Sequence, residues 1–315
     1  MLNLTFGPIP SRRFGMSLGV DLSAASKQCN FDCLYCELAP AKTVDKQTYI
    51  SSVEDIISEV KKSLKNHPNI DVITFTANGE PTLYPYLEEL IEQIDNIKGD
   101  IKTLILSNGA NIYDSNIQRI LSKIDIVKLS LDCVSAKCFK KIDRAHKDVN
   151  CDAIVDGIVS FRKIYKKELV IETLFVKDLN DSDSEINLLY NAYNKINPHR
   201  IDIGTIDRPP AYDVNPLTFE QLELIANKLN GLPITIAHKN RPKSLQYYSE
   251  NEIINLLKMR PLTHDDIENI FDKKFDMNFG QIYLWLFYLN SFFLQLSLAP
   301  CNSAIAFGNG RDNSA

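Results

Sequence analysis

Three cysteines within eight residues carry the strongest chemical signal in the sequence. Cys29, Cys33 and Cys36 lie in the segment KQCNFDCLYCEL with the spacing C-x3-C-x2-C. Thiolates are the usual ligands of iron–sulfur clusters, and three of them so close together can hold three corners of a cubane. The fourth iron would stay open to bind another molecule. We therefore expect a [4Fe–4S] cluster here, although the spacing alone also leaves zinc or thiol redox chemistry open.

Three further cysteines form a second candidate group. Cys133, Cys138 and Cys151 have the spacing C-x4-C-x12-C, which could hold an auxiliary cluster. Two of them fall in predicted helices, and cysteine is commonly buried in proteins as a small hydrophobic residue. We favour buried thiols over a second cluster. Seven cysteines in a long chain also argue against a disulfide framework.

The elements that must position these cysteines alternate regularly along the chain. Nearly continuous apolar runs with strand character are followed by amphipathic stretches of helical period, which predicts a parallel sheet covered by helices. The predicted strands are 17–23, 70–77, 101–107, 126–132, 168–176 and 200–206. The predicted helices are 53–67, 86–97, a stretch near 115–124, the sequence from about 135 to 167, and 183–196. Six such units can form an open sheet or curve into a partial barrel.

Short polar segments follow four of the predicted strands. These are the segments NGEPT (78–82), SNGAN (107–111), DCVS (132–135) and DLNDSD (178–183). In both architectures the carboxyl ends of parallel strands carry the chemistry. We therefore expect these loops to converge on one rim.

The cysteine segment CNFDCLYC, with Tyr35 before its last cysteine, resembles the signature of the radical S-adenosylmethionine (radical SAM) superfamily. GPIPSRRFGMSLGVDL, NGEPTLYP and IDRPPA resemble one branch of it, the Fe–S oxidoreductases related to the wybutosine (tRNA) synthetases. The resemblance covers about residues 5–235. It implies a partial (β/α)6 barrel of the TIM type, a [4Fe–4S] cluster and S-adenosylmethionine as cofactors.

The resemblance also implies cofactor contacts at the ends of three strands and beside the last cysteine. The implied contacts are Tyr35, Asn78, Gly79, Glu80, Pro81, Ser107, Asn108, Ser130 and Asp132. Short polar residues at strand ends can equally cap the next helix. Glu172 lies within an apolar strand and needs a partner, either near the bound cofactor or in a structural ion pair.

The activity that the resemblance implies is reductive cleavage of S-adenosylmethionine to a 5′-deoxyadenosyl radical, which abstracts hydrogen from a substrate. It implies an electron donor of flavodoxin or ferredoxin type and a tRNA base, or another anionic molecule, as the candidate substrate. Arg12, Arg13 and Arg208 could bind such an anion, or could form surface salt bridges. The formal net charge of −5 provides no global basic field for nucleic acid.

The sequence changes character towards its end. We expect a barrel domain at 1–240, a small helical module at 241–276, either winged-helix-like or a packed hairpin, and an uncharged apolar tail at 277–315. The helical module suggests an alternative function as an iron–sulfur, redox-sensing DNA-binding regulator. The tail is more consistent with a buried helix or a segment outside the fold than with a membrane anchor. The first residues lack the pattern of a secretory signal, so we expect a cytoplasmic protein.

Overall fold

The computed structural model describes residues 3–11 and 13–236, which form an eight-stranded sheet. Its strands follow one another in chain order, and all neighbours are parallel except the first pair. The strands are β1 (Thr5–Ser11), β2 (Gly15–Asp21), β3 (Val72–Thr76), β4 (Lys102–Ser107), β5 (Ile126–Ser130), β6 (Glu168–Phe175), β7 (Arg200–Thr205) and β8 (Ile234–Ile236). The strands β2 to β7 are the six parallel strands of a partial (β/α)6 barrel.

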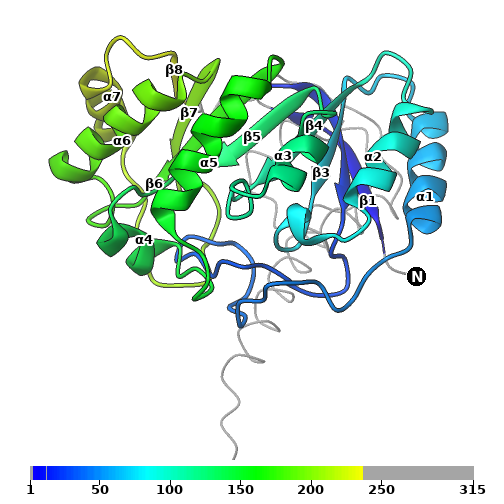
Figure 1. Ribbon diagram of the computed structural model, residues 1–315, viewed down its shortest axis with the longest axis horizontal. Helices are drawn as coiled ribbons and strands as arrows, with labels where there is room; N and C mark the ends of the chain where they lie inside the picture. The colour runs from blue at the N-terminus through cyan, green and yellow to red at the C-terminus, as the bar shows by residue number, and fades with distance from the viewer. Residues whose placement is uncertain (1–2, 12, 237–315) are drawn as a thin grey trace, which may run out of the picture. The chain divides into compact units, whose positions relative to one another are not determined.

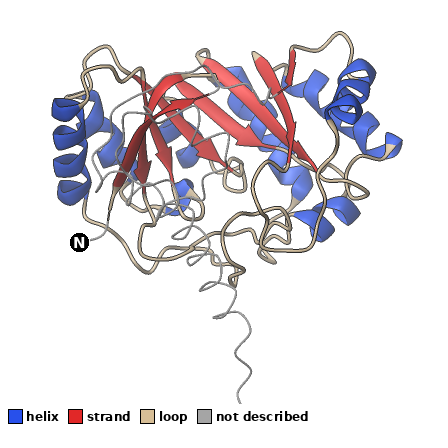
Figure 2. Ribbon diagram, turned by 180° about the vertical axis from the view of Figure 1, so that it is seen from behind, coloured by secondary structure: helices blue, strands red, loops and turns tan. Residues whose placement is uncertain are grey.

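Helices connect the strands and cover one face of the sheet (Figures 1 and 2). They are α1 (Val53–Asn66), α2 (Leu87–Asp95), α3 (Ser115–Leu121), α4 (Ala136–Ile142), α5 (Cys151–Ile164), α6 (Asp183–Ile196) and α7 (Phe219–Lys228), with one 3-10 turn, η1 (Pro81–Leu83). Side-chain caps begin most of them, because the first backbone N–H groups of a helix have no partner within it. Ser52 accepts a hydrogen bond from Asp55 N–H, and Thr218 and Gln221 form a reciprocal capping box.

Alternation along the strands gives the sheet two different faces. The face beneath the helices is buried and mostly apolar, with Leu18, Ile73, Ile105, Val127, Ile171 and Ile201 each 0 % exposed. On the other face, one layer of four residues packs around Phe14: Val72, Leu104, Ile126 and Val170. This layer fills the inside of the curve near the start of the strands. Above it lies a cavity of about 340 Å³, here called the lumen.

The six strands predicted from the sequence are confirmed as β2 to β7. The stretch predicted as helical from 135 to 167 is in fact two helices, α4 and α5, separated by residues 143–150. Strands β1 and β8 and helix α7 were not predicted. The predicted helical module (241–276) and tail (277–315) lie outside the described residues, as does Arg12. Within the described ranges, no helix has the length and apolar character that crossing a bilayer requires.

Candidate active site

The three cysteines lie on the long connection between β2 and α1, which runs along one end of the sheet in Figure 1. We call residues 28–37 the cluster loop. Its start pairs with the segment that follows β3: Gln28 N–H donates to the carbonyl of Asn78 (2.9 Å), and Glu80 N–H donates to the carbonyl of Gln28 (3.1 Å). These two bonds make a short parallel bridge between Gln28 and Gly79. The NGEP segment therefore holds the backbone directly before Cys29.

Only glycine fits between the two backbone bonds of this bridge. Gly79 has φ +146°, and a Cβ atom built on it would lie 1.9 Å from the carbonyl oxygen of Gln28. Both the conformation and the close approach exclude a side chain. Asn78 beside it donates its N–H to Asp21 Oδ1 (2.9 Å) and lines the lumen.

The carboxylate of Glu80 joins the ends of β3 and β4. It is 1 % exposed and accepts four hydrogen bonds, from the N–H and hydroxyl of Thr82 (2.9 and 2.6 Å), Ser107 Oγ (2.7 Å) and Asn108 N–H (2.8 Å). Burial raises the pKa of Glu80, while these donors act to lower it. Glu80 and Ser107 are therefore engaged with each other, and Pro81 starts η1 as a buried residue.

Asn108 links the end of β4 to the first cysteine. Its side-chain amide donates to Asn30 Oδ1 (2.7 Å) and approaches Cys29 Sγ at 3.6 Å. The backbone N–H of Phe31 approaches the same sulfur at 3.4 Å. Two N–H donors thus point at Cys29, an arrangement that stabilises negative charge on sulfur.

The middle of the cluster loop is fastened to α4 and the residues that follow it. The backbone N–H groups of Asp32 and Leu34 donate to the carbonyls of Asp143 (3.1 Å) and Ile142 (2.9 Å), on either side of Cys33. The thiol of Cys33 itself lies 3.9 Å from Asp143 Oδ1. Cys33 is therefore positioned mainly by backbone contacts to this one element.

Tyr35 and Asp132 connect the last cysteine to the end of β5. The Tyr35 hydroxyl donates to Asp132, whose other oxygen accepts from Leu174 N–H (2.7 Å). Burial raises the pKa of Asp132 to about 7. Ser130, half-buried as the last residue of β5, lines a small hollow together with Asn108. The sequence-predicted residues at the ends of β3, β4 and β5 thus gather around the cluster loop on one rim, as expected.

A third set of contacts comes from the segment that follows β7. Ala211 N–H donates to the carbonyl of Cys36 (2.9 Å), and the Tyr212 hydroxyl donates to Asp32 Oδ2 (2.5 Å). The guanidinium of Arg208 donates to both carboxylate oxygens of Glu37 (2.7 and 2.9 Å). The IDRPPA segment and the residue after it therefore hold the cluster loop by hydrogen bonds and an ion pair.

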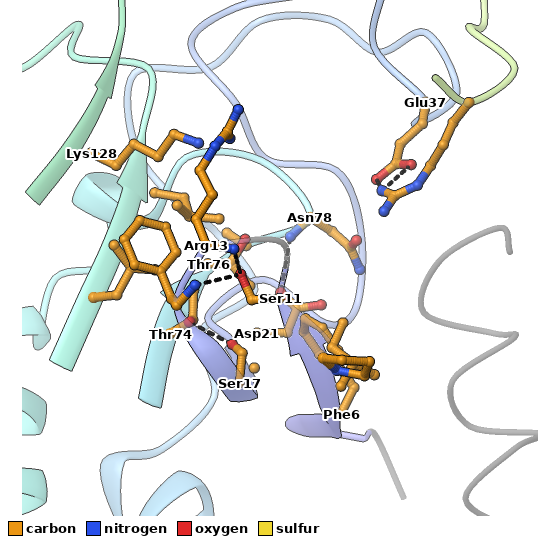
Figure 3. Close-up of a pocket in the computed structure, with 18 of the residues that line it drawn as sticks. Phe6, Ser11, Arg13, Ser17, Asp21, Glu37, Thr74, Thr76, Asn78 and Lys128 are labelled. Carbon is orange, nitrogen blue, oxygen red and sulfur yellow. Dashed lines mark hydrogen bonds and ion pairs between the residues drawn. The ribbon is translucent and has the colours of Figure 1, made fainter. Parts of the chain in front are cut away.

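Charged side chains occupy the floor of the lumen. Arg13 pairs with Asp202 (3.1 Å) and approaches Glu172 (3.8 Å), and Lys128 pairs with both acids. Figure 3 shows the ends of Arg13 and Lys128 side by side in this cavity. The position of Glu172 agrees with the structural ion-pair interpretation. Arg13 and Arg208 both have carboxylate partners, so the anion-binding hypothesis for them stays a prediction.

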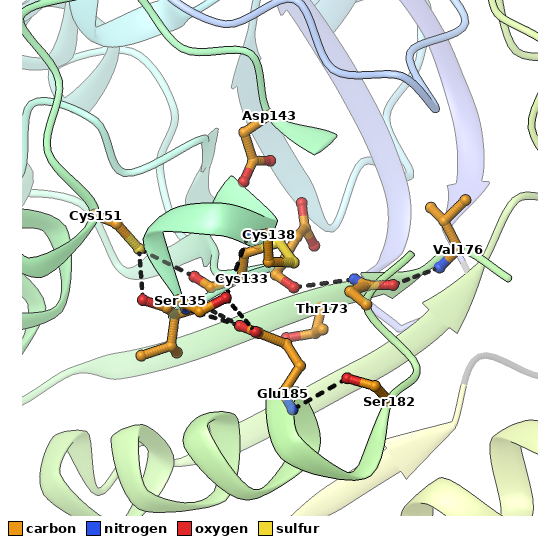
Figure 4. The surroundings of a disulfide bond; sticks show 12 residues. Cys133, Ser135, Cys138, Asp143, Cys151, Thr173, Val176, Ser182 and Glu185 are labelled. Atoms are coloured by element: carbon orange, nitrogen blue, oxygen red, sulfur yellow. Dashed lines mark hydrogen bonds between the residues drawn. A yellow bond between two sulfur atoms is a disulfide. The ribbon is translucent and has the colours of Figure 1, made fainter. Parts of the chain in front are cut away.

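The second group of cysteines differs from the expectation. Cys133 and Cys138 form a disulfide with their Cα atoms 5.6 Å apart, and the buried thiol of Cys151 donates to the carbonyl of Cys133 at 3.3 Å (Figure 4). The favoured picture of three separate thiols was wrong for this pair. Nearby Glu185 accepts hydrogen bonds from Val134 and Ser135, so its oxygens are already used. An auxiliary cluster on these cysteines has no support in the described part of the chain.

The sequence reasoning missed residues that hold the cluster loop through common groups. Ile142 and Asp143 do so through backbone carbonyls, which every residue type has, and Gln28 adds to its backbone bonds a buried side chain that bonds to Ser23, Thr48 and Tyr49. Asp32 could have been noticed as an acid between two cysteines. Its partner Tyr212, however, is 180 positions away in sequence.

The three cysteines suit a cluster that needs three thiolates. All are half-buried free thiols, and the loop that carries them is held from three sides. Burial raises the pKa of Cys29 to about 12 and that of Cys33 above its usual value. Binding iron must therefore displace protons from these sulfurs, as metal binding to thiols generally does.

Comparison with known proteins agrees with this geometry. The family model of the radical SAM superfamily matches residues 25–188. A UPF0026 protein of Helicobacter pylori (strain J99) is 42 % identical over 275 residues, covering 86 % of this chain and 89 % of that protein.

Solved structures show the same fold at lower identity. The structure of TYW1 with a lysine-pyruvate adduct bound is 20 % identical, with a TM-score of 0.53 over 78 % of this chain and 80 % of that one. Streptococcus suis SuiB bound to S-adenosylmethionine is 17 % identical, with a TM-score of 0.53 over 71 % and 52 %. The chain belongs to the radical SAM superfamily, whose enzymes use a [4Fe–4S] cluster and S-adenosylmethionine.

Proposed function

We propose that Cys29, Cys33 and Cys36 ligate the cluster of a radical SAM enzyme and that the rim around them binds S-adenosylmethionine. When bound, the two groups supply reductive cleavage of the sulfonium to a 5′-deoxyadenosyl radical, which abstracts a hydrogen atom from the substrate. The observation that carries this proposal is the three-sided attachment of the cluster loop to the strand ends. A loop so held presents three soft ligands with little loss of conformational freedom on binding.

The residues on the rim have separate roles in this proposal. Gly79 and Glu80 position the cluster loop and the end of β4. Asn78, Asn108 and Ser130 offer polar groups beside the lumen or the neighbouring hollow, where they can bind the amino acid and ribose parts of the cofactor. Tyr35 and Asp132 fix the backbone beside Cys36.

Anaerobic reconstitution with iron and sulfide tests the ligand assignment. We expect about four irons per chain, as a single [4Fe–4S] cluster requires. Cys29→Ala, Cys33→Ala and Cys36→Ala should each remove most of this iron and abolish 5′-deoxyadenosine formation with dithionite. Cys151→Ala is the matched control, because its thiol bonds only to backbone carbonyls, and it should retain the cluster.

Two results would contradict the proposal. One is full iron content in any of the three ligand variants. The other is eight irons in the wild type with half lost in Cys151→Ala, which would indicate a second cluster. Iron content and the visible spectrum of the cluster do not depend on activity. Both results can therefore be read even if no 5′-deoxyadenosine is formed.

The substrate is proposed at the level of chemical class. The lumen, about 340 Å³ in volume, is lined by apolar side chains together with cations (Arg13, Lys128, Arg208) and acids (Asp21, Glu37, Asp207), which suits a ligand that has both an apolar ring and charged groups. A tRNA base with its phosphate is one such ligand. This part of the proposal, like a cytoplasmic location, stays a prediction. The DNA-binding alternative depends on the module at 241–276, outside the described residues.

A further inference from the structure

A strongly basic surface lies on the element that holds Cys33. Residues 136–147 contain five cations and one acid, in a chain whose formal net charge is −5. The cations, which we call the basic face, are Lys137, Lys140, Lys141, Arg144 and Lys147, and all five are exposed. The one acid, Asp143, is buried and turned towards Cys33. The residue after Lys147, Asp148, is exposed and lies 3.4 Å from His146, so residues 136–148 present five cations and one acid to solvent.

The lysines of the basic face differ from many others on the surface in lacking carboxylate partners. On α3 and the turn after it, for comparison, Arg119 and Lys123 both pair with Glu88. Among the described residues, no ion pair involves Lys137, Lys140, Lys141 or Lys147. Arg144 alone is partnered, by Asp32 (3.3 Å) and by the ring of Tyr212. Unpaired cations keep their full attraction for an acidic partner.

The basic face is joined to the cluster loop by three backbone hydrogen bonds. Two flank Cys33, and the third runs from His146 N–H to the carbonyl of Asn30 (2.7 Å). Between them, the ring of Phe139 on α4 meets that of Phe31 edge to face, with centroids 5.5 Å apart. Figure 1 shows α4 beside the blue loop that carries the cysteines. A protein bound on α4 would therefore be separated from Cys33 only by the backbone of α4 and of the cluster loop.

We propose that the basic face is the docking surface for the electron donor, a small acidic protein of flavodoxin type. This inference rests on the proposed function, which needs one electron for each cleavage. The electron leaves the reduced flavin of the donor, which is oxidised by one equivalent, and reduces the cluster by one equivalent; no atom is exchanged. The transfer requires close approach to the cluster, and complementary charge speeds the encounter.

RNA is the other polyanion that could bind five cations. The geometry favours the donor, because no residue of the basic face lines the lumen, where a substrate must reach the radical. The face is also limited to one helix of seven residues and the turn after it. RNA binding is therefore treated as an outcome of the test.

The test reverses three charges and compares two reductants. The variant Lys137→Glu/Lys140→Glu/Lys141→Glu is matched by Lys163→Glu/Lys166→Glu/Lys195→Glu, which makes the same charge change at exposed positions near the amino ends of β6 and β7. Formation of 5′-deoxyadenosine is measured at low salt with reduced flavodoxin and, separately, with dithionite, which needs no docking surface. Reduction of the cluster by flavodoxin is followed in parallel by its visible spectrum.

With flavodoxin, the α4 variant should react about tenfold or more slowly than the wild type. With dithionite, the α4 variant should form 5′-deoxyadenosine at the wild-type rate. The control variant should form it at the wild-type rate with both reductants. The wild-type rate with flavodoxin should fall as salt is added. Equal losses in both variants, or no loss in the α4 variant, would overturn the docking surface.

The remaining outcomes separate this inference from the proposed function. If the α4 variant loses binding to tRNA in a gel-shift assay but keeps its rate with flavodoxin, the face binds RNA and the docking proposal is wrong. If the wild type forms no 5′-deoxyadenosine with either reductant, the proposed function fails. The spectrum then still shows whether flavodoxin reduces the cluster through α4.

Discussion

At the scale of single residues, one backbone contact fixes the start of the cluster loop. Gly79 lies between two hydrogen bonds that fix the residue before Cys29, and its Cβ position is 1.9 Å from the Gln28 carbonyl oxygen. Gly79→Ala should break this bridge, at a local cost of about 2–4 kcal/mol from the clash and the unfavourable φ. We expect markedly lower iron content after anaerobic reconstitution.

Gly99→Ala is the control for the Gly79 prediction. Gly99 also has a positive φ, +58°, but a Cβ atom there would meet nothing within 4 Å. The change should cost about 1 kcal/mol through backbone conformation alone and leave the iron content unchanged. Equal iron content in the two variants would show that the bridge to Gln28 does not position the cluster loop.

The residues of the site could be predicted from the sequence only where their type is informative. The spacing of Cys29, Cys33 and Cys36 identified the loop. The NGEP segment was predicted to contact the cofactor, and its bridge to Gln28 was not predicted. Residues that contribute a backbone carbonyl, such as Ile142, carry no signature, because other side chains would permit the same hydrogen bond. Gln28 was missed because the partners of its side chain, Ser23, Thr48 and Tyr49, are set by the fold. Tyr212 was missed because its contact with Asp32 depends on the closed fold of the chain.

At the scale of elements, the strands carry an ion network that is buried where the apolar layer ends. Asp202 on β7 is fully buried and pairs with Arg13, Lys128 and Arg200 at 2.9–3.2 Å. Asp202→Ala would remove the carboxylate that pairs with all three cations. It should therefore lower the free energy of unfolding by about 3–5 kcal/mol. Urea unfolding followed by circular dichroism should show a lower midpoint.

A surface ion-pair cluster provides the comparison for Asp202. Glu88 binds Arg119 and Lys123 on the outside of the helices, where solvent screens the charges. Glu88→Ala also removes one anion from between cations, and it should change the urea midpoint little. If the two variants unfold at the same urea concentration, the lumen network makes no special contribution to stability.

The predicted elements succeeded where periodicity was strong and failed where other constraints applied. The strands β2 to β7 are nearly continuous apolar runs, which identifies buried parallel strands. Strand β1 contains Pro8 and Pro10, which argue against a strand in the middle of a sheet but are tolerated at an edge. The capping box Thr218–Gln221 could have revealed α7. The break between α4 and α5 has a tertiary cause, since the residues there bond to the cluster loop.

At the scale of the whole chain, the site is assembled from segments that span most of the described sequence. The cluster loop begins at Gln28, and its last described hydrogen-bond partner is Tyr212, with β3, β4, β5 and α4 between them. The disulfide between Cys133 and Cys138 joins two of these segments, the end of β5 and α4. Every described hydrogen bond to the three cysteines therefore comes from within residues 28–212.

The last prediction concerns the residues beyond this assembly. Residues 277–310 contain no Asp, Glu, Lys or Arg, whereas charged residues occur throughout the preceding sequence. Truncation after Asp276 removes this apolar segment and none of the described contacts that hold the cluster loop. We expect the truncated chain to bind as much iron as the full chain and to stay in solution at higher concentration, because long apolar sequence without charge promotes association. Iron analysis and the concentration at which each form precipitates test this directly. A truncated chain that loses its cluster would show that the tail supports the barrel. A full-length chain that sediments with membranes, beside a truncated one that does not, would show instead that the tail is an anchor.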